Sequence, residues 1–438
     1  MSRGAGPRGF VIAAPASGAG KTTVTLGLVA ALVARGHNVV PAKSGPDYID
    51  PAFLAAAARR DCVTLDAFAA DPAQLRARAS AALAASGPGS LLVVEGAMGL
   101  FDGADDGTPA GCGSTADVAA ALGLSVVVVL DVARMGQGAA AIVRGLAGYR
   151  DDVRVAGVLL NRVASARHEQ MLRCSVGVVA PVLGTLGRYE DLVTPSRHLG
   201  LVQAGERADL ADFIATAAKR VSDGVDLGAL VDTAVAPHDG AEVRRLPPPG
   251  QRVAVARDLA FAFAYPHMLA DWRAQGAEIR PFSPLADEAP DAEADAVFLP
   301  GGYPELHAAQ LAAASRFREG MIDARARGAR IYGECGGYMV LGKALVDADG
   351  VSHRMLGFLE LETSFAARRM HLGYRRLTPR GGPWQGPMVA HEFHYATTLH
   401  AEGKPLFDAC DAAGTPLEPM GLVDGRISGS FAHVIEPG

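Results

Sequence analysis

Two glycine-rich turns in this 438-residue chain carry side chains whose types and spacing could do chemistry. One of them contains Cys335, which follows a strand-like run, has Gly336 directly after it, and precedes a helical pattern. Glycines beside a reactive side chain let the turn tighten and let a substrate approach the backbone. A helix N-terminus stabilises a thiolate, so this layout predicts a nucleophilic cysteine with a lowered pKa. The other interpretation is a buried, inert thiol.

A cysteine nucleophile needs a base and donors for an oxyanion. His433 is the candidate base, because cysteine and histidine that are far apart in sequence commonly pair in space at such sites. The backbone N–H of Gly336 could donate to the oxyanion of an acyl intermediate. A second donor is expected at Gly302, in a glycine turn that follows another strand-like run. These residues together predict acyl-transfer chemistry.

A second histidine segment, His391-Glu-Phe-His394, has an i, i+3 spacing that resembles a metal site. One such pair without further ligands is a weak signal, so substrate or interface contacts are the preferred interpretation.

The other glycine-rich turn follows residues 10–14 and reads Pro15-Ala-Ser-Gly18-Ala-Gly20-Lys21-Thr22-Thr23. Its glycines let consecutive backbone N–H groups converge on phosphate oxygens, and Lys21 could reach the terminal phosphates. The Thr22 hydroxyl stands where it would bind magnesium. Pro15 occupies the first glycine position of the usual pattern G-x-x-x-x-G-K-[ST], yet Gly-Lys-Thr keeps its place between strand and helix. We therefore predict ATP binding here, by Gly18, Gly20, Lys21, Thr22 and Thr23.

Carboxylates follow two other strand-like runs. Glu95 ends the apolar run 91–95 and is a candidate magnesium ligand beside Thr22, and Asp102 on the next loop could act on metal or substrate. The segment Lys43-Ser-Gly-Pro-Asp47-Tyr48-Ile-Asp50 follows another run, and Asp47 in it is the third candidate magnesium ligand. Ligands bind at the carboxyl edge of such sheets, although Gly-Pro and Asp-Pro also form turns without any function. Asn161, after residues 155–160, could recognise a base or only cap a loop.

The elements that must position these residues follow the rhythm of parallel βαβ units. Apolar runs at 10–14, 39–42, 91–95, 126–130 and 155–160 predict strands covered on both faces, because they are apolar throughout. Helical patterns lie between them at 22–34, 52–58, 73–85, 116–121 and 139–146. The rhythm breaks at the proline-rich stretch 236–250 and restarts with strands at 252–256, 297–299 and 329–332. We expect a domain boundary near Leu246, with domains at 1–240 and 251–438.

Composition limits the class of protein. A formal net charge of -6 argues against nucleic acid or an anionic membrane as a partner, and no apolar run is long enough to span a membrane. The five scattered cysteines suit a reducing compartment better than a disulfide framework. A cytoplasmic location is expected.

The chain resembles the cobyrinic acid and hydrogenobyrinic acid a,c-diamide synthases over nearly its whole length, with both glycine turns in the same order. The resemblance is closest to the aerobic-pathway enzymes. The motifs that carry it are APASGAGKTTVTLGL, SGPDYIDPAF, VVEGAMGLFDG, HLGLVQAGE, LPGGYPELHAAQL, YGECGGYMVLG, SFAARRMHLGYR, HEFHYA and GSFAHVI.

This resemblance implies an α/β fold, with an N-terminal dethiobiotin-synthetase-like P-loop domain and a C-terminal class I glutamine amidotransferase domain. It implies that Cys335 and His433 act as nucleophile and base. Ile435 stands where the acid of the usual triad would lie, two residues after the histidine, and Glu436 is one residue too late, so a Cys–His dyad is expected. The residues assigned to the acyl-phosphate and corrinoid region are Asp47, Tyr48, Glu95 and Asp102.

The implied activity is amidation of the a and c side-chain carboxylates of hydrogenobyrinic acid, with MgATP forming acyl phosphates and glutamine supplying ammonia. Cobalt-containing cobyrinic acid stays open as the substrate, and a homodimer stays open as the oligomeric state. The rival hypotheses are a cobyric-acid-synthase-like amidotransferase, a dethiobiotin-type ligase with a degenerate second domain, and a P-loop partitioning ATPase or switch.

Overall fold

The computed structural model describes residues 6–109, 111–192, 196–197 and 200–438. The chain forms two compact units, Met1–Val243 and Arg244–Gly438. His198 and Leu199, which belong to one of the motifs quoted above, lie outside the described residues. Each unit is described by itself below.

The first unit is built on a seven-stranded sheet in the order β3-β2-β4-β1-β5-β6-β7. Every strand pair in this sheet is parallel. The strands are β1 (Arg8–Ala13), β2 (Asn38–Ser44), β3 (Val63–Leu65), β4 (Ser90–Glu95), β5 (Ser125–Asp131), β6 (Val155–Val163) and β7 (Val182–Gly187), and a short β8–β9 pair (Ser196–Arg197 and Gly200–Leu201) stands apart.

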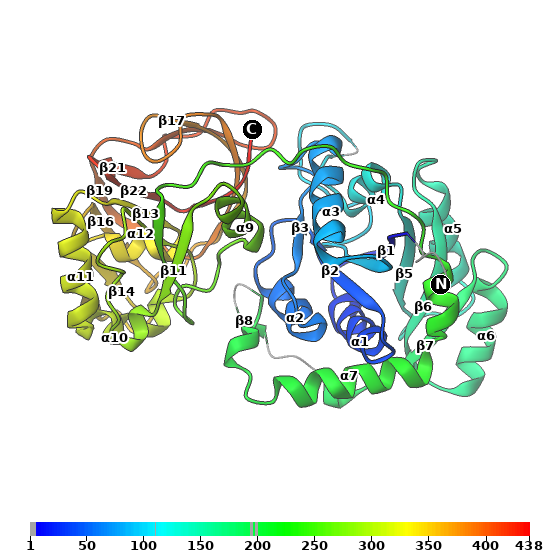
Figure 1. The fold of residues 1–438 in the computed structure, drawn as a ribbon. Helices are drawn as coiled ribbons and strands as arrows, with labels where there is room; N and C mark the ends of the chain where they lie inside the picture. The colour runs from blue at the N-terminus through cyan, green and yellow to red at the C-terminus, as the bar shows by residue number, and fades with distance from the viewer. Residues whose placement is uncertain (1–5, 110, 193–195, 198–199) are drawn as a thin grey trace. The chain divides into compact units, whose positions relative to one another are not determined.

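Helices cover both faces of this sheet, with α1 and α7 on one face and α3 and α4 on the other (Figure 1). Burial on both faces explains why the central strands are apolar throughout, so the predicted parallel α/β class of this unit is confirmed. The helices are α1 (Lys21–Ala34), α2 (Ile49–Ala58), α3 (Pro72–Ser86), α4 (Thr115–Leu122), α5 (Ala139–Gly148), α6 (Ala166–Val176), α7 (Leu210–Gly224) and α8 (Leu227–Asp232), with 3-10 turns η1 (Glu190–Leu192) and η2 (Ala204–Glu206).

The second unit has a six-stranded sheet in the order β11-β10-β12-β13-β22-β21. Its pairs are parallel except for the edge pair β21–β22, which is antiparallel. The strands are β10 (Arg252–Ala256), β11 (Glu278–Phe282), β12 (Ala296–Leu299), β13 (Arg330–Glu334), β21 (Leu422–Asp424) and β22 (Ile427–Ser430). This is the α/β arrangement expected for the C-terminal half.

The chain between β13 and β21, together with the C-terminal strand β23, adds mainly β structure, in two four-stranded sheets ordered β15-β14-β16-β19 and β20-β17-β18-β23. Their strands are β14 (Ala344–Val346), β15 (Ser352–Arg354), β16 (Glu360–Ser364), β17 (His371–Pro379), β18 (Met388–His394), β19 (Thr397–Glu402), β20 (Phe407–Cys410) and β23 (Ala432–Pro437). The second of these sheets matters for function, because β23 carries His433 and β18 carries the other histidine segment.

The helical segments of the second unit are α9 (Pro266–Ala274), η3 (Pro284–Ala286), η4 (Pro304–His307), α10 (Ala308–Ala313), α11 (Ser315–Ala326) and α12 (Gly336–Leu341). Within the described part of the chain, no helix of either unit combines the length and the apolar character that a membrane crossing requires.

Candidate active sites

Cys335 lies at a sharp turn between β13 and α12, which is the strand–turn–helix layout that the sequence predicts. Its backbone has φ 46° and ψ -104°, a conformation that an L-residue rarely adopts and that marks local strain. The turn is tight because glycines flank it: a Cβ on Gly337 would overlap the carbonyl oxygen of Leu299, and a Cβ on Gly333 would lie 2.8 Å from the backbone of Gly337. Strand, turn and helix therefore form a nucleophile elbow.

His433 lies beside this elbow. A Cβ placed on Gly301 would overlap Cε1 of the His433 imidazole, and it would lie 2.9 Å from its Nε2 and 3.2 Å from Cβ of Cys335. The imidazole and the cysteine therefore flank the same small space above Gly301. That glycine leaves room for both, a role that the sequence did not single out.

The two predicted oxyanion donors also lie close together. A Cβ on Gly336 would be 3.1 Å from the backbone nitrogen of Gly302. Gly302 itself must be glycine, because a Cβ there would overlap the carbonyl oxygen of Ala260. Among the residues that the structure describes, the Gly302 N–H has no backbone acceptor, so it is available to a ligand. The elbow and the neighbouring turn can therefore present two N–H groups to one oxygen.

A third group at this site, Glu334, was missed by sequence reasoning. Its carboxylate Oε2 lies 3.8 Å from Nδ1 of His433, and both side chains are buried. Glu436, which lies near the place of the usual triad acid, has its Oε1 3.9 Å from Nε2 of His267 instead. An acid therefore does stand close to His433, and it comes from the residue before the nucleophile.

The ionisation of the pair differs from the sequence prediction. Burial raises the pKa of the Cys335 thiol, the Glu305 carboxylate acts in the same direction, and the opposing effect of the Gly336 N–H is smaller. The predicted lowering of this pKa was therefore wrong, because burial outweighs the helix N-terminus. Burial, reinforced by His391 and His394, lowers the pKa of His433 to about 3. The resting pair is a neutral thiol and a neutral imidazole.

The second histidine segment lies on β18, where His391 pairs in register with His433 on β23. His371, Glu392 and His394 bring three ligand atoms within 4.8 Å of one another. Glu392, however, already binds Arg375 at 2.7 Å and His394 at 3.0 Å. The rings of His371 and His394 are stacked with an interplanar angle of 8°, and ligands of one ion cannot be stacked, because each must hold the ion in its own ring plane. The cluster therefore does not fit a metal.

In the first unit, the phosphate loop joins β1 to α1. Gly18 and Gly20 have φ of 80° and 84°, which favours glycine, and α1 begins at Lys21. The Lys21 ammonium donates to the Met98 carbonyl at 2.9 Å, across the loop from the first turn of α1. This is the geometry of an anion site, with bare N–H groups at a helix N-terminus and a lysine beside them.

Behind the loop, a buried lysine and several acids form a cluster that we call the Lys43 cluster, made of Thr22, Lys43, Asp47, Asp50 and Glu95. Lys43 Nζ lies 2.7 Å from Asp50, 2.9 Å from Glu95 and 3.7 Å from Asp47. The Thr22 hydroxyl donates to Glu95 at 2.7 Å. The structure thus brings together the three predicted metal ligands, and it adds Lys43 and Asp50, whose roles the sequence left open.

The Lys43 cluster shifts the ionisation of its members. Burial, reinforced by Asp50, raises the pKa of Asp47 to about 7. Burial also raises the pKa of Glu95, against the effect of Lys43. Burial disfavours the charge of Lys43, but Asp50 and Glu95 outweigh it and hold the pKa of Lys43 well above its ordinary value. Lys43 therefore stays an ammonium at neutral pH and offsets the carboxylates around it.

The Lys43 cluster fits a magnesium ion bound beside the phosphate loop. Carboxylate and hydroxyl oxygens are the ligands that Mg²⁺ prefers. Glu95 Oε2 is buried and has no hydrogen-bond partner among the described residues, so it has an unused lone pair close to Thr22. Asp47 is a weaker candidate, because its Oδ1 accepts the backbone N–H of Ile49 at 2.8 Å. Asp50, 3.2 Å from the Thr22 hydroxyl, joins the candidate ligands.

The remaining predicted residues lie around the same edge of the sheet. The Asn161 side chain donates to the Ala19 carbonyl at 2.9 Å, so it holds the phosphate loop, which favours the structural interpretation of this residue. Asp102 is exposed and accepts the Gly99 N–H at 2.8 Å, so it fixes the loop after β4. Tyr48 precedes α2 and is half-buried, and Thr23 lies in the first turn of α1.

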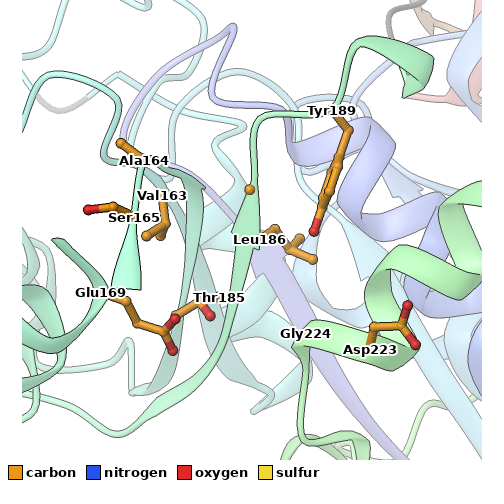
Figure 2. A pocket seen from close by; sticks show the side chains of 10 residues that line it. Val163, Ala164, Ser165, Glu169, Thr185, Leu186, Tyr189, Asp223 and Gly224 are labelled. Carbon is orange, nitrogen blue, oxygen red and sulfur yellow. The ribbon is translucent and has the colours of Figure 1, made fainter. Parts of the chain in front are cut away.

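A separate cavity of about 310 Å³ lies along β7, with Glu169 and Thr185 on one side and Tyr189 and Asp223 on the other (Figure 2). None of the predicted site residues lines it. Its lining is Val163, Ala164, Ser165, Glu169, Thr185, Leu186, Gly187, Tyr189, Asp223 and Gly224.

Two family models match the chain. The CobQ/CobB/MinD/ParA nucleotide binding domain matches residues 10–202, which contain the phosphate loop and the Lys43 cluster. The CobB/CobQ-like glutamine amidotransferase domain matches residues 252–436, which contain the elbow and His433.

Curated relatives match over nearly the full length. A protein from Sinorhizobium sp named hydrogenobyrinate a,c-diamide synthase is 58% identical to this chain, over 98% of this chain and 98% of the relative. The protein of that name from Rhizobium meliloti is 56% identical, over 98% of this chain and 99% of the relative. The protein of that name from Rhodobacter capsulatus is 52% identical, over 98% of this chain and 99% of the relative. The two sites and these likenesses agree, and the chain belongs to the hydrogenobyrinate a,c-diamide synthase family of glutamine-hydrolysing ligases.

Proposed function

We propose that this protein uses ATP and glutamine to convert the a and c side-chain carboxylates of hydrogenobyrinic acid into carboxamides. The observation that carries the proposal is identity of 52% to 58%, over 98% of the chain, to proteins named for this product. The two candidate sites supply the two halves of the chemistry. In this proposal residues 1–240 form the synthetase domain and residues 251–438 form the glutaminase domain.

In the glutaminase half, Cys335 attacks the side-chain amide of glutamine. The thiol is neutral at rest, so its proton passes to Nε2 of His433 as the sulfur–carbon bond forms. The N–H groups of Gly302 and Gly336 stabilise the oxyanion, and His433 returns the proton to the leaving nitrogen. Ammonia departs and leaves a thioester, which water then hydrolyses to glutamate.

In the synthetase half, a carboxylate of the corrin must first be activated, because attack by ammonia would otherwise have to expel oxide. The phosphate-loop N–H groups and Lys21 hold the phosphates of ATP, and the carboxylate takes the terminal phosphoryl group to become an acyl phosphate. Ammonia then displaces phosphate to give the carboxamide. Asp102 and Tyr48 are the proposed contacts to the macrocycle, and two cycles would amidate both side chains.

A magnesium ion bound by Thr22, Glu95 and either Asp47 or Asp50 would neutralise charge on the transferred phosphoryl group. The Lys43 ammonium keeps these carboxylates close together despite their mutual repulsion. The protein's own contribution is therefore to position the phosphates and the acidic side chains in one place.

The division between the two halves can be tested with Cys335→Ala. We expect this variant to lose glutamine-dependent amidation and to retain amidation with ammonium salts, with product formation followed by mass spectrometry. Retained use of glutamine would remove Cys335 from the mechanism. ATP hydrolysis by the intact enzyme that responds to neither glutamine nor corrinoid would favour a switch protein instead.

The choice of corrinoid needs a second measurement. Metal-free hydrogenobyrinic acid and cobalt-loaded cobyrinic acid should be compared side by side at equal concentration, with ATP and glutamine in excess. We expect a higher kcat/KM for the metal-free ring. Equal or better turnover of the cobalt form would contradict the proposed substrate.

A further inference from the structure

His433 can act as a base at Nε2 only if its proton sits on Nδ1, and a hydrogen-bond acceptor at Nδ1 normally fixes this tautomer. In the sequence, neither nearby position supplies such a group. Ile435 is apolar, and the Glu436 carboxylate approaches His267. The imidazole already has a hydrogen bond to the backbone of Phe263, so the question is which side chain pairs with Nδ1 and stabilises the charged ring.

Glu334 meets the geometric requirement. It is the last residue of β13, and its Oε2 lies 3.8 Å from Nδ1 of His433. Its other oxygen, Oε1, accepts the N–H of Val434 at 3.1 Å and the O–H of Tyr332 at 3.2 Å. These two bonds fix the carboxyl group, and one of them comes from the residue directly after the histidine. The separation of 3.8 Å is longer than a hydrogen bond, and catalytic hydrogen bonds are often long in a free enzyme and tighten when substrate binds.

We propose that Glu334 is the positioning residue of His433. Its carboxylate accepts a hydrogen bond from Nδ1–H, which leaves Nε2 free to act on Cys335, and it stabilises the imidazolium that forms when the thiol proton arrives. The proposal rests on the glutaminase role of Cys335 and His433 given above. It replaces the dyad expected from the sequence with a triad in which acid and nucleophile are adjacent in the chain.

Because Glu334 and Cys335 are neighbours in the chain, the acid and the nucleophile are positioned together. Because β13 runs directly into the elbow, one short segment places the acid 3.8 Å from Nδ1 of the imidazole and carries the nucleophile in the very next residue. No separate loop has to deliver the acid, so a substitution in the C-terminal strand two residues after the histidine would not remove it.

The carboxyl must be ionised to stabilise the positive charge of the imidazolium through the Nδ1–H hydrogen bond. Burial raises the pKa of Glu334 to about 8, so its ionisation should appear in the pH dependence of glutamine hydrolysis as a rising limb. The other titratable groups around it and around the Cys–His pair are Tyr332 on β13, His391, Glu392 and His394 on β18, and Glu305 on η4.

The test is Glu334→Gln in the full-length enzyme, with Glu436→Gln as the matched control, since both are buried glutamates close to a histidine. We expect Glu334→Gln to lower kcat for glutamine hydrolysis on the order of 10²–10⁴-fold, with KM for glutamine changed less than about threefold. The rising limb between about pH 7 and 9 should disappear, while the control keeps both the rate and the limb. Amidation with ammonium salts should stay at the wild-type rate in both variants.

Two outcomes would overturn the proposal: Glu334→Gln with wild-type kcat and an unchanged pH profile, or equal losses in both glutamate variants. If Glu334→Gln also loses ammonium-dependent amidation, Glu334→Asp decides, since it keeps the charge. Recovery of the limb in that variant supports the proposal, and its absence refutes it. Cys335→Ala, assayed alongside, distinguishes failure of the Glu334 proposal from failure of the glutaminase assignment. Only retained glutamine hydrolysis by Cys335→Ala would refute the glutaminase assignment.

Discussion

Gly301→Ala perturbs the placement of His433 without touching its chemistry. The new methyl group would overlap Cε1 of the imidazole and lie 2.9 Å from Nε2, where ordinary van der Waals contact begins at 3.4 Å. His433 is buried, so the ring cannot swing into solvent and must instead shift by roughly 1 Å within its packing. A displacement of that size costs a catalytic group on the order of 100-fold in rate.

The assay compares glutamine-dependent amidation with ammonium-dependent amidation in the same preparation. We expect Gly301→Ala to lower the first about 100-fold and to leave the second unchanged. Gly386→Ala is the matched control, because its Cβ would meet nothing within 4 Å and its backbone is exposed. Glutamine-dependent turnover by Gly301→Ala within twofold of the control would refute the placement of His433 above Gly301.

Three further predictions concern other parts of the molecule. Lys43→Met should destabilise the first unit by about 3–5 kcal/mol, because it leaves the buried Glu95 and the half-buried Asp50 without their cation, and a wild-type melting curve would contradict this. Gly20→Ala should weaken ATP binding at least about tenfold by calorimetry, because its φ is 84° and its Cβ would overlap the Asn161 amide; Gly138→Ala, with open space around it, should bind normally. Glu334→Gln should change the pH dependence of stability. The pKa of Glu334 is about 8 in the folded protein and 4.5 in the unfolded chain. The wild-type protein therefore has its full contribution from this group below pH 4.5, and it loses on the order of 4 kcal/mol of stability as pH rises from there through about 8. The melting temperature of the variant should therefore rise relative to wild type between pH 5 and 9, and parallel curves would count against the shifted pKa.

The sequence predicted the parallel sheets well, because strands buried on both faces are apolar throughout and stand out from the helices between them. It did not predict the added β structure between β13 and β21. Strand β17 has mostly exposed or half-buried residues and includes Arg375 and Arg376, so its pattern does not separate it from a loop. Its place is decided by pairing with β18 and β20, which are close to it only in the folded chain.

The glycine turns were predictable because their chemistry is local. Glu334 was missed because its partner His433 is distant in sequence, and the role of Lys43 stayed open because Glu95 lies 52 residues away, yet a signal existed for both. Each is a charged residue at the carboxyl end of a buried strand, which is the pattern that singled out Glu95. The thiol pKa was misjudged because a sequence shows the helix that follows the cysteine but not the depth at which the sulfur is packed.

The depth of that packing bears on how the enzyme survives between turnovers. Cys335 is 1% exposed and protonated, whereas Cys174 on α6 is exposed, so an alkylating reagent or peroxide in solution reaches Cys174 far more readily. Thiolates are the forms that such compounds modify. A sulfur that stays protonated and buried until glutamine binds is protected against oxidation while no substrate is present. Its reactivity then depends on the bound substrate.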